Sequence, residues 1–446
     1  MSILGVDIGT TGLKMGVFDI VSDALSLTKT FSKEYDINVY NDGQFGDIEP
    51  DKWRKAFVDG CKSLEAYVRD VDVIALAGTT PGLTAMDSDG EALYPAILML
   101  DQRSRKQALE IIDTVGLENL MAATGNMPVS GGCSLSSILW IKENLQEVFS
   151  KTCKFGHSNT YMARWLTGKF AIDPSSASLT ALYNTADFKL IWNENIAGTF
   201  GISTSLLPEI LPAYESAGRV TKSIAADLGF RKEPPVLIGG NDAVLAAYSV
   251  GVENPGDVIN VNGTCEITLI CLPKCLSSVN HNIRTHVIPN RWLTLYVMNA
   301  GGKALEWFFR LFCRDMSAER FYNDFLPNAV DKWLDRDCTV TYTPFLMGSR
   351  YSQEPLKAEF LGLTQETTRE ELVTALVKGL CEYQSLHLNE VCRHVPLNDT
   401  IYLTGSALNE PIMRAKKKWM YNSSYVYNEQ SSMKGAAMLG RRYLKV

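Results

Sequence analysis

The residues with the clearest chemical potential lie in a glycine-rich turn near the start of the chain. Asp7 follows an apolar run and precedes Gly9-Thr10-Thr11-Gly12, with Lys14 two residues further on. Glycine lets backbone N–H groups approach a phosphate closely, and threonine adds a hydroxyl donor. A carboxylate beside such groups usually acts through Mg²⁺, because a bare carboxylate and a phosphate repel each other. The alternative is an ordinary β-hairpin with a polar turn.

The same pattern occurs again about 250 residues later in the chain. Residues 257–269 predict a strand, a turn at Gly263-Thr264 and a second strand. Two related hairpins this far apart predict two related half-molecules that face one nucleotide. The repetition favours phosphate binding over an ordinary turn at both positions.

A third candidate is the segment Gly239-Gly240-Asn241-Asp242, between a predicted strand and a helix rich in small residues. Asp242 at such an exposed turn could accept a proton from a substrate hydroxyl, as a general base does. It could equally cap the following helix by accepting a hydrogen bond from the first backbone N–H groups. The local sequence leaves both interpretations open.

Two further segments suit a nucleotide. Gly301-Gly302 precedes a predicted helix, where paired glycines let a ligand approach the N–H groups of the first turn. Residues 404–409 follow a predicted strand and contain Gly405 and Asn409 among small residues that would suit a flat ring. A tight loop or an ordinary turn would explain either segment equally well.

These segments are positioned by strands that alternate with helices along the whole chain, which predicts an α/β protein. Residues 369–392 predict one long helix, and residues 231–235 carry two prolines typical of an interdomain joint. At 446 residues each half is long enough to bury its own core. We therefore expect two domains, residues 1–233 and residues 234–446.

Composition excludes several classes of protein. The net charge of −7 argues against a nucleic-acid surface, although a local phosphate site remains compatible with it. No apolar run is long enough to span a membrane, and the N-terminus has no signal-peptide pattern, so we expect a cytoplasmic protein. The five histidines show no metal-ligand spacing, and Lys416-Lys417-Lys418 is expected to form a solvated helix face.

Taken in order, these segments resemble the FGGY carbohydrate kinases, and most closely their xylulokinase-like branch. The similarity covers essentially the whole chain. Its motifs are residues 5–11, 95–98, 101–103, 239–243, 254–265, 358–363 and 435–437. Several motifs in the right order are far more specific than any one of them.

The resemblance implies two actin-like, ribonuclease-H-like domains with a catalytic cleft between them. It implies phosphorylation of a sugar or polyol hydroxyl, with ATP and Mg²⁺ as cofactors. Asp242 would be the base, and Asp7 would hold Mg²⁺. The groups that would bind the nucleotide and its phosphates are Thr10, Thr11, Lys14, Gly263, Thr264, Gly301, Gly302, Gly405 and Asn409. The sugar would contact Thr80, Pro81, Asp101 and Asp242.

The chain departs from the family mainly on the sugar side. Thr79-Thr80-Pro81-Gly82 stands where xylulokinases usually carry Gln-Met-His-Gly, and Met99 stands where many members place tryptophan. A pocket built for different hydroxyls rejects the usual substrate strongly, because buried polar groups left without a partner are costly. We therefore expect a ketose, a polyol or a sugar acid as substrate, without choosing among them.

Two other functions stay open from the sequence. One is an actin-like ATPase of another class, and the other is a non-catalytic module that binds nucleotide or sugar and regulates a partner. The Asp7, Asp242 and Thr264 residues argue for an active kinase. The partner expected is a small sugar or polyol, with no nucleic acid and no membrane, and a homodimer is one assembly that the sequence allows.

Overall fold

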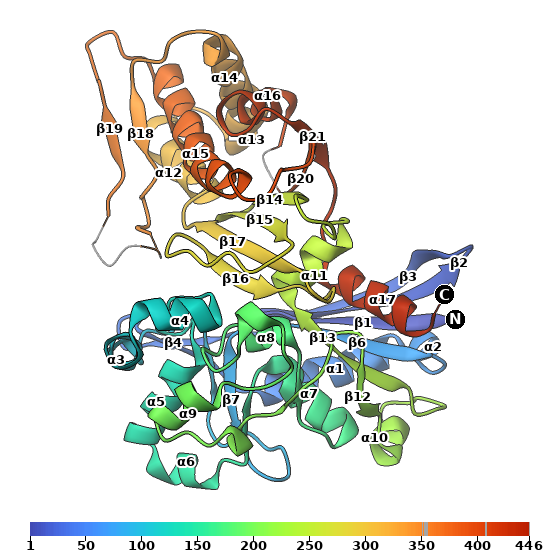
Figure 1. The fold of residues 1–446 in the computed structure, drawn as a ribbon. Coiled ribbons are helices and arrows are strands. Elements are labelled where there is room, and N and C mark those ends of the chain that lie inside the picture. The colour runs from blue at the N-terminus through green and yellow to red at the C-terminus, as the bar shows by residue number, and fades with distance from the viewer. Residues whose placement is uncertain (350, 352–355, 406–407, 446) are drawn as a thin grey trace.

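The computed structural model describes residues 1–349, 351, 356–405 and 408–445 (Figure 1). Two six-stranded sheets form the centre of the molecule. The first has the order β12 (Ser216–Arg219), β13 (Pro235–Asn241), β6 (Val73–Gly78), β1 (Ser2–Ile8), β2 (Gly12–Val21), β3 (Ala24–Glu34). The second has the order β16 (Asn282–Thr285), β17 (Trp292–Met298), β15 (Glu266–Leu272), β14 (Val258–Asn262), β20 (Thr400–Gly405), β21 (Ser424–Tyr427).

Three smaller sheets accompany them within the described residues. A five-stranded sheet has the order β4 (Asn38–Tyr40), β5 (Phe45–Ile48), β8 (Ala96–Leu98), β7 (Gly82–Met86), β9 (Lys154–Gly156). The two-stranded sheets are β10 (Ala171–Ile172) with β11 (Glu209–Ile210), and β18 (Thr341–Thr343) with β19 (Glu359–Leu361).

The helices cover these sheets. Those before β13 are α1 (Asp51–Ser63), α2 (Glu65–Val68), α3 (Arg105–Val115), α4 (Leu117–Thr124), α5 (Ser134–Asn144), α6 (Gln146–Lys151), α7 (Ser158–Thr167), α8 (Pro174–Ala177), α9 (Glu194–Thr199) and α10 (Lys222–Asp227). Those after it are α11 (Asp242–Ser249), α12 (Gly302–Phe312), α13 (Ala318–Arg320), α14 (Leu326–Leu334), α15 (Arg369–Cys392), α16 (Glu410–Trp419) and α17 (Ser432–Tyr443). Short 3₁₀ turns lie at Thr185–Asp187 and Thr204–Leu206, and a π-helical turn at Phe321–Phe325.

The two large sheets repeat one topology. In the first, β1, β2 and β3 pair antiparallel in sequence, and β6 and then β13 join β1 in parallel on its other side. In the second, β14, β15 and β17 pair antiparallel, and β20 and then β21 join β14 in parallel. The internal repeat that the two hairpins indicate is therefore present in the fold.

The first sheet extends beyond the boundary expected at residue 233. β13 (Pro235–Asn241) pairs in parallel with β6, so it completes the first sheet rather than opening the second domain. Pro235 is therefore the first residue of a strand of the first sheet, and Pro234 directly precedes it. Further on, α17 returns from the second half to pack against β1, β6 and α11.

One apolar cluster joins the two halves of the molecule. It contains Ile3 of β1, Leu245 of α11, Ile259 of β14 and Leu439 of α17, all fully buried. The burial of such side chains is worth about 1.5–3 kcal/mol each. As a result the two ends of the chain lie side by side, next to α17 (Figure 1).

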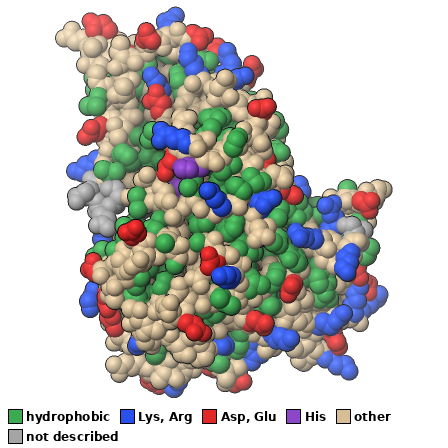
Figure 2. Space-filling model, in the orientation of Figure 1, with side chains coloured by type: hydrophobic (Ala, Val, Ile, Leu, Met, Phe, Trp, Pro, Cys, Tyr) green, Lys and Arg blue, Asp and Glu red, His purple; other side chains and the backbone are tan. Residues whose placement is uncertain are grey.

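The surface carries charges of both signs. Figure 2 shows Lys, Arg, Asp and Glu side chains scattered over the face in view, with hydrophobic side chains between them across the middle. A single-sign stripe of the kind that binds nucleic acid is not visible on this face. Among the described residues, no helix is long and apolar enough to cross a membrane.

Candidate active site

The ends of three neighbouring parallel strands bring the predicted residues of the first half together. Asp7 lies near the end of β1, Thr80 just after β6, and Asp242 directly after β13. Parallel strands that run side by side present their carboxyl ends at one edge of the sheet, where ligands bind in open α/β sheets. These residues line a cleft of about 1030 Å³ that also contacts the second hairpin at Cys265.

The structure separates the two interpretations of Asp242. Asn241 is the residue that caps α11, because its side-chain oxygen accepts a hydrogen bond from Val244 N–H at 3.2 Å. Oδ1 of Asp242 accepts hydrogen bonds from Ala243 N–H at 2.7 Å and from the Asn241 amide at 3.0 Å. The capping role thus belongs to Asn241, and Asp242 faces the cleft as a positioned carboxylate.

The surroundings of Asp242 suit a base that works near neutral pH. Burial raises the pKa of its carboxyl to about 7, and the negative charge of Asp7 contributes to this rise. The Ala243 N–H, the Arg284 guanidinium and the Asn241 amide oppose the rise. A carboxylate with a pKa near the working pH combines a useful unprotonated fraction with adequate basicity.

Asp7 fits a divalent cation. Its Oδ1 is buried and has no hydrogen-bond partner, and burial raises the pKa of this carboxyl. The Ser432 hydroxyl and the Lys14 charge act in the opposite direction. A buried oxygen without a partner is costly unless something occupies it, and carboxylate oxygen is the ligand that Mg²⁺ prefers. Asp7 would therefore hold Mg²⁺ through that oxygen.

The turn after Asp7 is held tightly by short contacts. Gly9 N–H donates to Gly12 O at 2.9 Å, and the Tyr35 hydroxyl donates to Gly9 O at 2.6 Å. The Thr10 and Thr79 hydroxyls lie 2.9 Å apart, and both line the cleft. Of the remaining predicted groups, Thr11 and Lys14 are exposed and do not line it.

The second hairpin gathers the other predicted glycines around it. Gly302 N–H donates to Gly263 O at 2.8 Å, and Lys303 N–H donates to Thr264 O at 3.2 Å. Gly301 packs as closely, since a Cβ there would lie 2.8 Å from Cβ of Glu266. These glycines therefore let α12 seat directly on the hairpin, and Thr264 remains exposed at its tip.

The segment predicted to suit the flat ring of a nucleotide follows the neighbouring strand, β20. Gly405 has φ of +108°, and a Cβ there would approach Asn262 O to 1.9 Å, so only glycine fits. Asn409 caps α16, its side-chain oxygen accepting a hydrogen bond from Ile412 N–H at 3.1 Å. Ser406 and Ala407, which belong to the same predicted segment, lie outside the described residues.

One lysine of the predicted solvated face is instead buried beneath the hairpin. Lys416 is 3% exposed and its Nζ donates to Glu266 at 2.7 Å and to Asn260 at 3.0 Å. The Asn260 amide in turn donates to Glu266 and to the Thr268 hydroxyl, both at 3.0 Å. The expectation of three solvated lysines was wrong at this position, because one face of α16 packs on the sheet.

The sugar-side residues divide into two groups. Thr80 lines the cleft, and its hydroxyl accepts a hydrogen bond from the Asn241 amide. Pro81 is joined to Thr80 by a cis peptide bond and is buried. Asp101 is fully buried and does not line the cleft: it accepts hydrogen bonds from Gly46 N–H at 2.7 Å and from Arg103 at 2.8 Å. A direct contact between Asp101 and a sugar stays a prediction.

Sequence reasoning missed Arg284 of β16. Its side chain is 3% exposed, lines the cleft, and lowers the pKa of Asp242. Asn126 reaches it from the other half of the molecule, accepting a hydrogen bond at 3.3 Å from the guanidinium and at 2.8 Å from Ile283 N–H. A lone arginine in the middle of a strand carries no motif that would have indicated this position.

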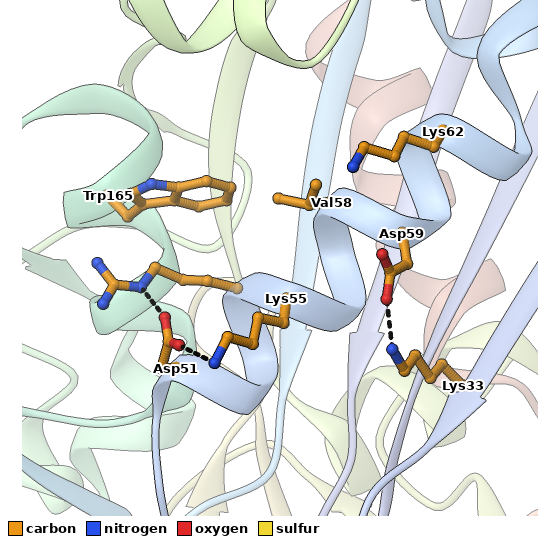
Figure 3. A pocket seen from close by; sticks show the side chains of 8 residues that line it. Lys33, Asp51, Lys55, Val58, Asp59, Lys62 and Trp165 are labelled. Atoms are coloured by element: carbon orange, nitrogen blue, oxygen red, sulfur yellow. Dashed lines mark hydrogen bonds and ion pairs between the residues drawn. The ribbon is translucent and has the colours of Figure 1, made fainter.

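A second hollow, of about 530 Å³, lies apart from the cleft on α1 and the end of β3 (Figure 3). Its charged side chains are largely paired with one another: Asp51 with Arg54 at 3.1 Å and with Lys55 at 2.8 Å, and Lys33 with Asp59. It shares no lining residue with the cleft.

Comparison with known proteins places the chain among sugar kinases. Residues 2–249 match the sequence model of the N-terminal domain of the FGGY family of carbohydrate kinases. Xylulose kinase of Staphylococcus xylosus is 25% identical over 98% of this chain and 90% of its own length. Xylulose kinase of Lactococcus lactis is 27% identical over 98% of this chain and 87% of its own length.

Solved structures agree on the fold. The crystal structure of xylulose kinase from Rhodospirillum rubrum has a TM-score of 0.91 at 20% identity, covering 99% of this chain and 89% of that one. The crystal structure of gluconate kinase from Lactobacillus acidophilus has a TM-score of 0.88 at 20% identity, and the match covers 100% of this chain and 89% of that one.

With its repeated sheets and its carboxylate-lined cleft, the protein is a two-domain member of the actin-like, ribonuclease-H-like fold class. Within that class the chain belongs to the FGGY family of carbohydrate kinases, on its xylulokinase-like side. Members of this family phosphorylate sugars with ATP, generally with a divalent metal, and this chain is an ATP-dependent carbohydrate kinase.

Proposed function

We propose that Asp242 is the general base that accepts the proton of the sugar hydroxyl as that hydroxyl attacks the terminal phosphate of ATP. The observation that carries this proposal is a half-buried carboxylate in the cleft whose pKa is raised to about 7. The Ala243 N–H and the Asn241 amide hold the Asp242 carboxylate by hydrogen bonds. These two groups and the Arg284 guanidinium limit the rise of its pKa. Phosphoryl transfer depends mostly on positioning and charge neutralisation, which these contacts supply.

We assign the cation to Asp7, which would hold Mg²⁺ through its partnerless Oδ1. The metal supplies charge neutralisation at the phosphates when it is bound. Thr10 stands beside Asp7 in the cleft, and its hydroxyl suits a phosphate oxygen. Thr11 and Lys14 are assigned to the same phosphates from the outer side of the turn, where both are exposed.

The other half of the molecule would hold the nucleotide. Thr264 and the backbone around Gly263 would bind phosphate at the exposed tip of the second hairpin. Gly301 and Gly302 support that hairpin from α12, and Gly405 lets β20 lie against Asn262. Asn409, at the start of α16, is assigned to the nucleotide beside Gly405.

The substrate proposed is a ketose, a polyol or a sugar acid. The relatives are named as kinases of xylulose, a ketose, and of gluconate, a sugar acid. Thr80 and Pro81 replace residues that xylulokinases usually carry at this wall, so we propose a hydroxyl pattern other than that of xylulose. Asp101 would serve the sugar side as a positioning residue, because it holds Gly46 N–H and Arg103 beneath that wall.

The test is ADP release with Mg-ATP across ketoses, polyols and sugar acids, run on the native chain and on Asp242→Asn. We expect turnover on one substrate, and a loss of about 10²–10⁴ in kcat for Asp242→Asn, the usual scale for a positioned base. Nucleotide affinity of the variant should stay within about twofold, since Asp242 contacts the hydroxyl side. Equal turnover by both chains would refute the role of Asp242.

The non-catalytic alternative makes a different prediction, namely ligand binding without turnover on any substrate. The relatives reported above are named as kinases, which favours an enzyme.

For the cellular location of the protein we propose the cytoplasm. All ten cysteines are free thiols, as is usual in a reducing compartment.

A further inference from the structure

A second group of possible ligands lies beside the cleft, apart from Asp7 and Asp242, and reaches it at His281. His281 directly precedes β16, and His387 and Glu390 lie three residues apart on α15, which places them on the same face of that helix. One ligand atom from each of the three side chains lies within 4.8 Å of the other two. Two imidazoles and a carboxylate at this spacing are a common donor set for a transition metal.

The two histidines present the same unsatisfied atom. Both side chains are 1% exposed, and Nδ1 of each is buried without a hydrogen-bond partner. A buried polar atom left without a partner costs about 1–3 kcal/mol. Two such atoms, belonging to rings whose centroids are 5.0 Å apart, indicate a common occupant between them.

The opposite ring nitrogens are already engaged. Nε2 of His281 lies 2.8 Å from Leu276 O, a carbonyl that can only accept, so this ring carries its proton on Nε2. Nε2 of His387 lies 2.8 Å from the Thr294 hydroxyl, which can accept its proton. Ligating histidines typically donate their other N–H to a carbonyl or similar oxygen, which fixes the ring and exposes the lone pair of Nδ1.

Further contacts hold the group in place. The Ser278 hydroxyl donates to Glu390 at 3.1 Å, and the ring of Tyr296 stacks on His387 with centroids 4.6 Å apart. Burial lowers the pKa of both imidazoles. A lowered pKa favours the neutral imidazole, which is the form that binds a metal.

We propose that His281 Nδ1, His387 Nδ1 and the Glu390 carboxylate bind one divalent transition-metal ion of the Zn²⁺ type, separate from the Mg²⁺ of the phosphates. Nitrogen donors select against Mg²⁺ and Ca²⁺, which take oxygen ligands. Three protein ligands leave a fourth position of a tetrahedral site for water or another ligand. Ser278 and His281 line the cleft, so the site adjoins it.

Such an ion would tie the segment before β16 to α15. His281 comes from that segment, and the other two ligands come from the helix that covers the second sheet. The proposal rests on this geometry alone and does not depend on the assignment of Asp242 or Asp7. Binding would also stabilise the fold, because an ion that binds only the native state raises the free energy of unfolding.

The test is a titration of the chelator-treated full chain with Co²⁺ and with Zn²⁺, in the presence of Mg²⁺ to fill oxygen sites. Visible absorption of bound Co²⁺ reports its ligands, and calorimetry reports affinity and stoichiometry. The variants are His387→Gln and Glu390→Gln, and the matched control is His394→Gln. His394 is exposed and near the end of the same helix, outside the cluster.

We expect one ion per chain, bound at least about tenfold more weakly by either variant and equally well by the control. The thermal unfolding midpoint should rise with Zn²⁺ in the native chain and not in the variants. Glu390 is only partly buried, so Glu390→Gln remains informative if His387→Gln fails to fold. Affinity unchanged in Glu390→Gln, thiolate absorption of Co²⁺, or no binding at micromolar metal would overturn the proposal.

Discussion

Asp7 and Asp242 are coupled through their charges, and this gives the enzyme a defined pH dependence. The pKa of Asp242 is raised to about 7 by burial and by Asp7, and only the unprotonated form can accept a proton. We expect kcat/KM to fall as the pH decreases through about 7. A rate that stays level well below that pH would contradict the assignment.

The Asp7 contribution to this pKa can be measured directly. Asp7→Asn removes the negative charge, so the pKa of Asp242 should fall, and binding of Mg²⁺ to the native chain should lower it as well. Carboxyl ¹³C-NMR titration of the nucleotide-free chain reports the shift without requiring activity. An unchanged Asp242 titration in Asp7→Asn would show that burial alone sets the value.

The same raised pKa makes Asp242 a cost to stability. A group whose pKa is higher in the folded state stabilises the fold fully below its unfolded pKa, near 3.8, and loses that contribution as the pH rises through about 7. Asp242→Asn should therefore be more stable than the native chain at about pH 8, by up to a few kcal/mol, and nearly equal at about pH 4. Urea unfolding at both pH values, without Mg²⁺, checks the sign.

At the scale of single elements, the buried pair Lys416–Glu266 joins α16 to the second hairpin. Lys416→Met leaves the Glu266 carboxylate buried without its cation, which typically costs about 3–5 kcal/mol of unfolding free energy. The adjacent Lys417 is exposed, so Lys417→Met should change stability by no more than about 0.5 kcal/mol.

The double variant Lys416→Met/Glu266→Gln isolates the reason for that loss. Replacing the carboxylate by a neutral amide removes the uncompensated charge, so much of the stability should return. Urea unfolding of the four chains forms a double-mutant cycle for this pair. Additive losses would instead mean that Lys416 acts only through packing.

The elements themselves could be predicted closely where the signal is local. The long helix at residues 369–392 and the strand-to-helix turn at Asp242 were confirmed, because periodicity and small residues mark them within one segment. The role of Lys416 could not be predicted, since its partner Glu266 is 150 residues away in the chain. The same holds for His281 and His387, whose rings come together only because α15 packs on the second sheet, next to the segment before β16.

At the scale of the whole molecule, the sequence repeat predicts the two related sheets. It does not predict which distant strands pair or which contacts join the two halves. Proline at 234 and 235 suggested a domain boundary, yet β13 pairs with β6 in the first sheet. Hydrogen bonds between Asn126 and Ile283 also cross between the halves, at 2.8 and 2.9 Å. Strand partners chosen by long-range packing leave no local signature, so these features appear only in three dimensions.

Helix α17 connects the C-terminal part of the chain to the helix that carries Asp242, the proposed base. Gly435 of α17 packs against α11 so closely that a Cβ would meet Leu245 O at 2.0 Å, and α11 begins at Asp242. Gly435→Ala should therefore push the two helices apart and cost about 1–3 kcal/mol of unfolding free energy. Because α11 carries Asp242 at its first residue, kcat should fall with it.

Gly198 of α9 provides the matched control, because a Cβ there meets nothing within 4 Å. Gly198→Ala should leave kcat unchanged and raise stability by up to about 0.5–1 kcal/mol, since alanine loses less backbone entropy in a helix. Urea unfolding gives the stability of the two variants, and steady-state kinetics gives their kcat values for comparison with the native chain. If Gly435→Ala behaves like Gly198→Ala, then α17 does not fix the position of α11 and has no part in placing Asp242.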